Sequence, residues 1–337
     1  MRIDIILEPD QTAHDFARLG RMAEECGIGG VWVPNNNNNR DPFVNFSALA
    51  LQSSKIRMGA IAVSPFELHP YKMALSLLTL NELSDGRAQI VVGAGGGTVQ
   101  AMGKQSERPV RAVREAIEIL CEAAQGKRFK YPGQMYTVNW MNTSWAQADP
   151  PGIYAGSNGP QMLAMAARRA PGIMVSDFTP ERIQWVRDII DPILAERGEA
   201  PASFPLNNFW AWHVKEDPDA ANREARPWLC VRGTIYPKYI RDVVDEDEAE
   251  IVLANLPSFA KAYYSRTPEI EGVPDAIVDK IIAHSVSASP LSEIQTEVER
   301  FKTFQAAGLT QIALRLYDEP EKSIQAIGEH IVPALAD

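Results

Sequence analysis

Short apolar runs alternate with longer amphipathic segments along almost the whole chain, and this alternation constrains the fold more than any other feature. The runs are rich in Val and Ile and nearly continuous in apolar residues, which is typical of parallel strands buried on both faces of a sheet. We predict eight strands, at 3–7, 30–33, 56–63, 88–92, 153–155, 172–175, 208–214 and 311–316. Eight strand–helix units in 337 residues favour a closed (β/α)8 TIM barrel over an open doubly wound sheet.

The segments between the predicted strands carry apolar residues at helical spacing. We expect helices at 12–25, 43–52, 70–83, 108–125, 161–169, 180–196, 219–229 and 321–335, and no regular element in 131–151, which is rich in Asn, Gln and Pro. Between the seventh helix and the eighth strand, residues 231–309 lack strand patterning. We therefore predict a single domain over 1–337, with a helical insertion at 231–309 over the carboxyl-terminal mouth of the barrel, where substrate loops normally lie.

The balance of charges argues against several classes of partner. Lys and Arg number 33 against 43 Asp and Glu, so the formal net charge is −10. Because nucleic acids and anionic membranes bind basic surfaces, we expect neither as a partner and a small molecule as the substrate. Three widely spaced cysteines, and the lack of an apolar run of about 18 residues, are typical of a reduced, soluble cytoplasmic protein.

Two loops of small residues follow neighbouring predicted strands. The first, Gly93-Ala94-Gly95-Gly96-Gly97-Thr98, comes after the fourth strand; the second, Ala155-Gly156-Ser157-Asn158-Gly159-Pro160, comes after the fifth and opens a helix. Glycine lets a phosphate or a ring approach the backbone, and free N–H groups at a helix start attract anions. Each loop alone is equally well explained as a tight turn, but together they predict a cradle for a phosphorylated cofactor.

Other polar residues stand at the ends of predicted strands. Glu8 follows the first strand, where burial near the mouth would raise its pKa toward general-acid use, and a structural role is an equal alternative. The asparagine run 35–39 follows the second strand and is either a turn-rich loop or a hydrogen-bonding surface for a ligand. The five histidines show no metal-binding spacing and no nucleophile motif occurs, so we expect neither a metal site nor nucleophilic catalysis.

Several segments resemble one known superfamily. Trp32-Val33-Pro34, residues 56–65, the stretch TLNELSDGRA at 79–88 and residues 153–162 look like the bacterial-luciferase-like superfamily of flavin and deazaflavin oxidoreductases. Within it, Glu8-Pro9-Asp10, the loop 154–163 and the tail 321–324 are most similar to the methylenetetrahydromethanopterin reductases, which use coenzyme F420. The resemblance covers nearly the whole chain.

The resemblance implies a (β/α)8 barrel, a homodimer, and a deazaflavin bound across the carboxyl-terminal mouth. It places a non-prolyl cis peptide between Ile61 and Ala62, behind the cofactor ring, and assigns Asn35 and Ala60 to the same part of the cofactor site. The two glycine loops would hold the cofactor's side chain and phosphate, through Gly95, Gly96, Ala155, Gly156, Ser157, Asn158 and Gly159.

Three positions depart from the family. Asn35-Asn36 stands where the family commonly has Asp-His, Gly96 stands where it often has an acid, and Ile6 stands where the reductases have a glutamate. The remaining candidates for catalysis are Glu8 and Asn36, of which Asn36 can form hydrogen bonds but cannot take up a proton.

We therefore predict an F420-dependent oxidoreductase that transfers a hydride between the deazaflavin and a small organic substrate, with a pterin-type C–N bond as the substrate that best fits the missing acid. One alternative is an FMN-dependent luciferase-like monooxygenase, although no basic residue stands near Ser157 in the sequence to hold the FMN phosphate. The other is a flavin- or deazaflavin-binding protein without turnover, which the missing acid and the missing Asp-His pair favour.

Overall fold

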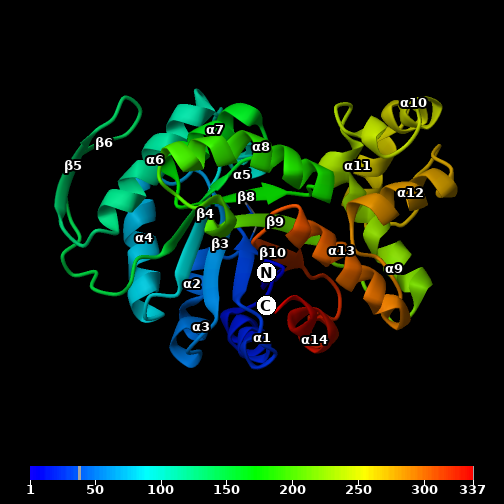
Figure 1. Cartoon of the computed structure of the whole chain (residues 1–337), viewed down its shortest axis with the longest axis horizontal. Helices are drawn as coiled ribbons and strands as arrows, with labels where there is room; N and C mark the ends of the chain where they lie inside the picture. Colours follow the sequence, from blue (N-terminus) through cyan, green and yellow to red (C-terminus); the bar gives the residue numbers. More distant parts are fainter. Residues whose placement is uncertain (37–38, 337) are drawn as a thin grey trace.

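Eight parallel strands close into a barrel, and this confirms the predicted TIM-barrel fold. The computed structural model describes residues 1–36 and 39–336. Around the barrel the strands follow the order β1-β10-β9-β8-β7-β4-β3-β2 (Figure 1). Their bounds are β1 (Arg2–Ile6), β2 (Gly30–Pro34), β3 (Arg57–Val63), β4 (Ala88–Val92), β7 (Gly152–Gly156), β8 (Gly172–Ser176), β9 (Leu206–Ala211) and β10 (Gln311–Arg315). Each lies within two residues of a predicted start, but β9 ends three residues before its predicted end.

Helices surround the barrel and bury its outer face. The longer ones are α1 (Ala13–Glu25), α4 (Pro70–Leu83), α6 (Pro109–Ala123), α7 (Pro160–Arg169), α8 (Pro180–Glu196) and α13 (Ile294–Ala306). The start of α1 is fixed by a capping box, in which Thr12 and Asp15 each accept a backbone N–H of the other. Such caps satisfy N–H groups that the first turn cannot pair, and so define where a helix begins.

Three predicted helices are interrupted. The segment 219–229 is divided between α9 (Pro218–Ala225) and a 3₁₀ helix (Arg226–Val231). The segment 43–52 forms α2 (Pro42–Asn45) and α3 (Ser47–Gln52), and the tail forms α14 (Pro320–Ala326), a π-helical turn (Ile327–Ile331) and α15 (Val332–Leu335). Pro333 stands at the start of α15 and lacks the N–H that a continuous helix would need.

A polar layer fills the amino-terminal end of the barrel. Arg2 donates two hydrogen bonds to buried Asp4, at 2.9 and 2.8 Å, and the indole of Trp32 donates a third at 2.9 Å. Arg2 also bonds to Gln311 at 2.9 Å. Because this layer is filled by partnered side chains, the space for a ligand lies at the other end of the strands.

The stretch 131–151 is not irregular as expected. Most of it joins an antiparallel hairpin of β5 (Arg128–Pro132) and β6 (Thr137–Asn142), which projects at the left of Figure 1. Glu115 of α6 anchors the hairpin's turn by accepting backbone N–H groups of Met135 and Tyr136, at 2.9 and 3.0 Å. The expectation of a loop failed because only one face of the hairpin is packed.

A group of helices extends from the barrel on the side opposite the hairpin (Figure 1). It contains α9 (Pro218–Ala225), α10 (Glu246–Ala254), α11 (Leu256–Ser265) and α12 (Asp275–Ser285), whose apolar side chains form a cluster separate from the main core. The side chains of α13, by contrast, belong to the main core and pack near α8. The insertion bounds 231–309 stay a prediction, and this packing favours an insertion that ends before α13.

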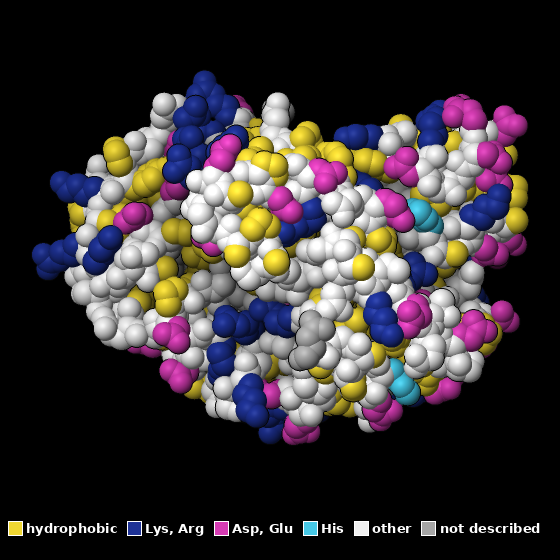
Figure 2. Space-filling model, viewed as in Figure 1, with side chains coloured by type: hydrophobic (Ala, Val, Ile, Leu, Met, Phe, Trp, Pro, Cys, Tyr) yellow, Lys and Arg dark blue, Asp and Glu magenta, His cyan; other side chains and the backbone are white. Residues whose placement is uncertain are grey.

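The acidic run near residue 245 forms the first turn of α10, where Asp245 and Glu248 make a capping box. Figure 2 shows acidic side chains gathered over this end of the molecule, with both signs of charge interspersed elsewhere on the same face. Within residues 1–36 and 39–336, no helix combines the length and apolarity needed to cross a membrane.

Candidate active site

A cavity of about 620 Å³ lies at the carboxyl-terminal ends of the barrel strands. Residues at or just after the ends of seven of the eight strands line it. They are Pro34, Asn35 and Asn36, Ile61, Ala62 and Glu67, Val91 and 93–98, 156–158, 174–176, Phe209 and Arg315. Convergence of strand ends on one cavity is how TIM barrels build their active sites.

The structure brings most of the predicted site residues together here. Those that line the cavity are Asn35, Asn36, Ile61, Ala62, Gly95, Gly96, Gly156, Ser157 and Asn158. Ala60 and Ala155 are instead buried in the main core, Gly159 precedes α7 outside the lining, and Glu8 reaches the cavity only through a neighbour. Asn37 and Asn38 lie outside the described residues. The roles assigned to all of these residues stay predictions.

Strand β3 bends where it meets the cavity. The expected cis peptide is present between Ile61 and Ala62, and the pairing of β3 with β4 shifts register between Ala60 and Val63. The backbone N–H of Asn35 donates to the carbonyl of Ile61 at 2.7 Å, which ties the end of β2 to the bend. The Ala62 side chain is thereby exposed at the cavity wall.

The glycine loop after β4 leaves open space along the cavity. A Cβ added to Gly96 or Gly97 would meet no atom within 4 Å, whereas Gly95 has a φ of +91° and a Cβ there would lie 2.4 Å from Val99. The Thr98 hydroxyl donates to the carbonyl of Asn35 at 3.3 Å and joins this loop to β2. Gly95 is therefore required by the turn, and the next two glycines leave room for a ligand.

The loop after β7 presents a polar group without a partner. Ser157 is only 3% exposed, lines the cavity, and has a hydroxyl that forms no hydrogen bond to any described residue. Its backbone N–H donates to Met174, and the Asn158 amide oxygen accepts the Ser176 N–H, each at 3.0 Å. A buried hydroxyl without a partner costs free energy, so this loop fits a ligand that supplies the missing hydrogen bond.

Glu67, which was not among the predicted site residues, is the one carboxyl group among the described residues that line the cavity. The side-chain amide of Asn35 and the backbone N–H of Ser64, the latter at 2.8 Å, both donate to its Oε1. Burial raises the pKa of Glu67 against the opposing effect of these two hydrogen bonds. The available signal was its place four residues after β3, at the same end of the barrel as Glu8.

Arg315, the last residue of β10, was also missed. Its guanidinium donates to both carboxylate oxygens of Glu8, at 2.6 and 3.1 Å. Burial alone would lower the pKa of Arg315, but the nearby Tyr317 and Glu8 outweigh it and raise the pKa above its usual range. Glu8 is therefore the partner of a permanent cation at the cavity wall and does not itself line the cavity.

Around Arg315, buried and half-buried ionisable groups form a paired network that we call the ionic cluster: Glu8, Asp177, His213, Glu224, Arg232 and Arg315. Arg232 pairs with Asp177 at 2.7 Å and also donates to the Tyr317 hydroxyl. His213 lies 2.7 Å from Glu224 and stacks on the Tyr317 ring at 4.4 Å. Burial lowers the pKa of His213 to about 4, although Glu224 opposes the shift.

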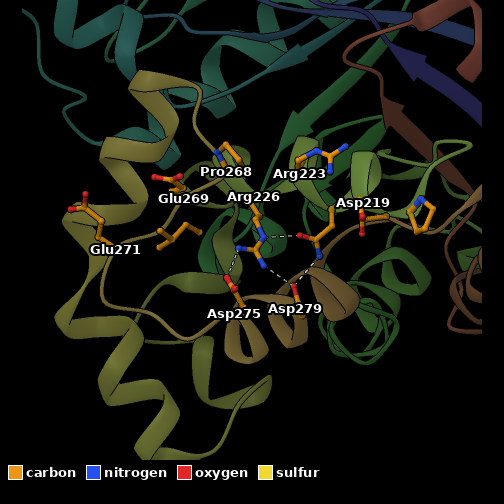
Figure 3. A pocket seen from close by; sticks show the side chains of 12 residues that line it. Asp219, Arg223, Arg226, Pro268, Glu269, Glu271, Asp275 and Asp279 are labelled. Carbon is orange, nitrogen blue, oxygen red and sulfur yellow. Dashed lines mark hydrogen bonds and ion pairs between the residues drawn. The ribbon is translucent and has the colours of Figure 1, made fainter.

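A second hollow, of about 790 Å³, lies among the helices that extend from the barrel and shares no lining residue with the barrel cavity (Figure 3). Arg226 stands between Asp275 and Asp279, at 2.6 and 3.1 Å, and both carboxylates are more than half exposed. Exposed, mutually paired charges give this hollow no group in need of a ligand. In the described parts of the chain, no cluster of His, Cys, Asp or Glu could hold a metal ion.

A comparison of the sequence with known protein families covers most residues of the cavity, the bend in β3 and both glycine loops. The pattern of a protein family described as luciferase-like monooxygenase matches residues 1–311. The chain belongs to this family.

One relative of known sequence and two solved structures are similar to this chain over its full length. The 5,10-methylenetetrahydromethanopterin reductase of Archaeoglobus fulgidus is 29% identical over 342 aligned positions, covering 99% of this chain and 100% of the relative. The solved structure of the coenzyme F420-dependent tetrahydromethanopterin reductase from Methanopyrus kandleri superposes with a TM-score of 0.82, at 22% identity and 99% coverage of both chains. An F420-dependent secondary alcohol dehydrogenase superposes with a TM-score of 0.74, at 19% identity and full coverage of both chains. The two structures support the fold.

Proposed function

We propose that this protein is a coenzyme F420-dependent oxidoreductase that transfers a hydride between the deazaflavin and a small organic substrate with a pterin-type C–N bond. The observation that carries the proposal is the end-to-end similarity to the Archaeoglobus reductase, because the cavity's geometry fits a deazaflavin without choosing it over related rings. The family relationship supports an oxidoreductase in the same way.

The cavity residues divide into two sets for such a cofactor. Ile61 and Ala62 would support the ring from behind, with Asn35 fixing their backbone. The glycine loop after β4 and the segment 156–158 would hold the side chain and phosphate, where Ser157 offers its unpartnered hydroxyl. When bound, the cofactor supplies the hydride, and the protein supplies placement and electrostatics.

Glu8 and Arg315 act as a positioning pair in this proposal. The bidentate contact holds the guanidinium at the cavity wall, beside the ring of Phe209. Asn36, which also lines the cavity, is a hydrogen-bonding residue for substrate or cofactor. Truncating Glu8 would therefore affect substrate placement more than cofactor affinity.

FMN is the less favoured cofactor. Its terminal phosphate carries close to two negative charges at pH 7, as phosphate monoesters do. Among the described residues that line the cavity, Arg315 is the one cation, and Glu8 already neutralises it. A homodimer and a cytoplasmic location complete the proposal; both rest on the family resemblance and the sequence composition.

The proposal is tested by titrating the purified apoprotein with F420 and with FMN and following cofactor fluorescence. We expect F420 to bind and FMN to bind at least tenfold more weakly, a difference of about 1.4 kcal/mol. Preference for FMN would transfer the protein to the monooxygenase alternative. Binding of F420 without reduction of any pterin, alcohol or enone substrate would favour the alternative without turnover.

Gly156→Leu tests the cradle. A Cβ at this position would lie 3.2 Å from Val91, so a longer side chain would enter the cavity lining and weaken F420 binding about tenfold. Gly233→Leu is the control, because this glycine lies on the insertion with open space around it. Both variants should melt near the wild-type temperature, and equal F420 affinity in both would remove this loop from the site.

A further inference from the structure

Glu67 lies where a proton donor is needed. It lines the cavity and accepts a hydrogen bond from the side-chain amide of Asn35, the residue that follows β2. It is half-buried, so that its carboxyl group is shielded by protein but still borders the open cavity. The other ionisable side chain in the described lining is Arg315, which is paired with Glu8.

The loop around Glu67 is held rigidly. The Glu67 and Leu68 N–H groups both donate to the Ser64 carbonyl, at 3.1 and 3.0 Å, and the Phe66 N–H donates to the Ser64 hydroxyl at 3.2 Å. The two hydrogen bonds that the side chain accepts go to Oε1. Among the described residues, none donates to Oε2, which leaves one oxygen of an oriented carboxyl group for a ligand.

The proposed reaction needs a proton as well as a hydride. When a carbon that bridges two nitrogens is reduced, the hydride adds to that carbon with its electron pair, one C–N bond breaks, and the released nitrogen takes up one proton. Asn35, Asn36, Ser157 and Thr98 cannot give up a proton near neutral pH, and Arg315 is permanently charged. Both oxygens of Glu8 accept hydrogen bonds from Arg315 and so are occupied.

We propose that the Glu67 carboxyl group exchanges the proton with the substrate bound in the barrel cavity, held in place by the Asn35 amide and the Ser64 N–H. In the reductive direction it gives its proton to the substrate nitrogen, becomes a carboxylate, and regains a proton from solvent. In the reverse direction it accepts the proton. This inference rests on the proposed function, because the reduced deazaflavin supplies the hydride.

The surroundings of Glu67 suit this role. Burial raises its pKa, which keeps a larger fraction of the carboxyl group protonated near neutral pH. Other ionisable groups border the same loop: Lys104, whose ammonium donates to the Phe66 carbonyl at 3.0 Å, and His69, whose ring accepts the Tyr71 N–H. With Arg315 across the cavity, these are the charges that a pH profile must take into account.

The test compares wild type with Glu67→Gln, which keeps the shape and loses the proton. A matched control is Glu24→Gln, because Glu24 also accepts backbone N–H groups, from Ser54, Lys55 and Ile56, but lies away from the cavity. The first readout is the number of protons taken up when F420 binds, from calorimetry in buffers of different ionisation enthalpy. A bound ring removes water from Glu67 and raises its pKa further, so wild type and Glu24→Gln should take up a fraction of a proton that Glu67→Gln does not. The cofactor's own titration is common to all three proteins and cancels.

The second readout is turnover of 5,10-methylenetetrahydromethanopterin with reduced F420. We expect Glu67→Gln to bind F420 within threefold of wild type while kcat falls about 100-fold and the pH dependence flattens. Glu67→Asp should recover part of the rate and the pH dependence, and it replaces Glu67→Gln should the amide variant fail to fold. Equal proton uptake in wild type and Glu67→Gln would overturn the assignment of Glu67. Failure of wild type to bind F420 would instead overturn the proposed function.

Discussion

Two polar regions meet at the carboxyl-terminal end of the barrel, and they differ in how their groups are paired. The cavity wall formed by β2, β3, β4 and β7 carries amides, glycines, one carboxyl group and the unpartnered hydroxyl of Ser157. The ionic cluster at the ends of β1, β8, β9 and β10 carries two ion pairs, Glu8–Arg315 and Asp177–Arg232, and a buried His213 ring within 3 Å of Glu224. The unpartnered Ser157 hydroxyl lies in the cavity lining, whereas the paired charges other than Arg315 lie outside it.

This difference separates ligand binding from support. Glu8 and Glu67 both follow a barrel strand, but Glu8 meets a guanidinium and Glu67 meets an amide and a backbone N–H. Glu8 is held by two hydrogen bonds from a guanidinium, whereas Glu67 has no cationic partner and burial raises its pKa. In the proposed reaction, Glu67 therefore carries the proton that is exchanged, and the Glu8–Arg315 pair carries charges that stay fixed.

Breaking the ionic cluster should have the largest effect. Asp177→Asn keeps the backbone, since asparagine tolerates the φ of 59° at this position, but it leaves buried Arg232 without its counter-charge. We expect a loss of about 3 kcal/mol in the free energy of unfolding, measured by urea titration. The control is Glu246→Gln in the exposed pair with Arg241, where solvent screens the charges and the free energy of unfolding should barely change. Similar losses in both variants would mean that the cluster does not support the fold.

The pH dependence of stability should differ in sign between the two regions. The pKa of His213 is about 4 in the folded protein and 6.5 without perturbation, so its contribution to stability is present above pH 6.5 and is lost as the pH falls toward 4. For Glu67, whose pKa is raised, the contribution is present at low pH and is lost as the pH rises through its folded pKa.

Replacing His213 isolates this effect. Wild type should lose at most about 3 kcal/mol between pH 6.5 and 4 through His213, and His213→Gln should show a correspondingly flatter profile by urea unfolding at each pH. Lys215 and Arg232, which also lower the His213 pKa, remain in the variant, so they affect both profiles alike. Parallel profiles would show that His213 is not buried as a neutral ring.

Much of the fold could be predicted from the sequence because a parallel barrel needs strands that are apolar on both faces. Each of these apolar runs can be recognised from its local sequence alone, and so can the glycine loops that follow β4 and β7. The β5–β6 hairpin could not be recognised in this way, since β5 has no buried residue, β6 buries only Val138 and Met141, and Trp140 is 72% exposed. The ends of β9 and α13 depend on how the insertion packs, which local periodicity does not report.

The candidate site was harder to predict for a related reason. The bend at Ile61–Ala62 and the open glycines follow from local sequence and from the family resemblance. The pairing of Glu8 with Arg315 joins residues 307 positions apart and exists only because β1 and β10 are neighbours in the closed barrel. Glu67 gains its place from a loop conformation and from Asn35 on another strand. Sequence position alone therefore selected Glu8 over Glu67.

The smallest expected effect on stability distinguishes two glycines of the loop after β4: Gly95, which the turn requires, and Gly96, which leaves room for a ligand. Gly95→Ala should cost about 1–2 kcal/mol in the free energy of unfolding, because φ is +91° and the new Cβ would collide with Val99. Gly96→Ala should cost less than Gly95→Ala, because the φ of −157° at Gly96 lies outside the left-handed region and no atom lies within 4 Å of the new Cβ. If the cofactor occupies that open space, Gly96→Ala weakens F420 binding although the fold is unchanged. Unfolding curves and F420 titrations of the two variants would check both expectations, and an unaltered F420 affinity in Gly96→Ala would move the cofactor away from this loop.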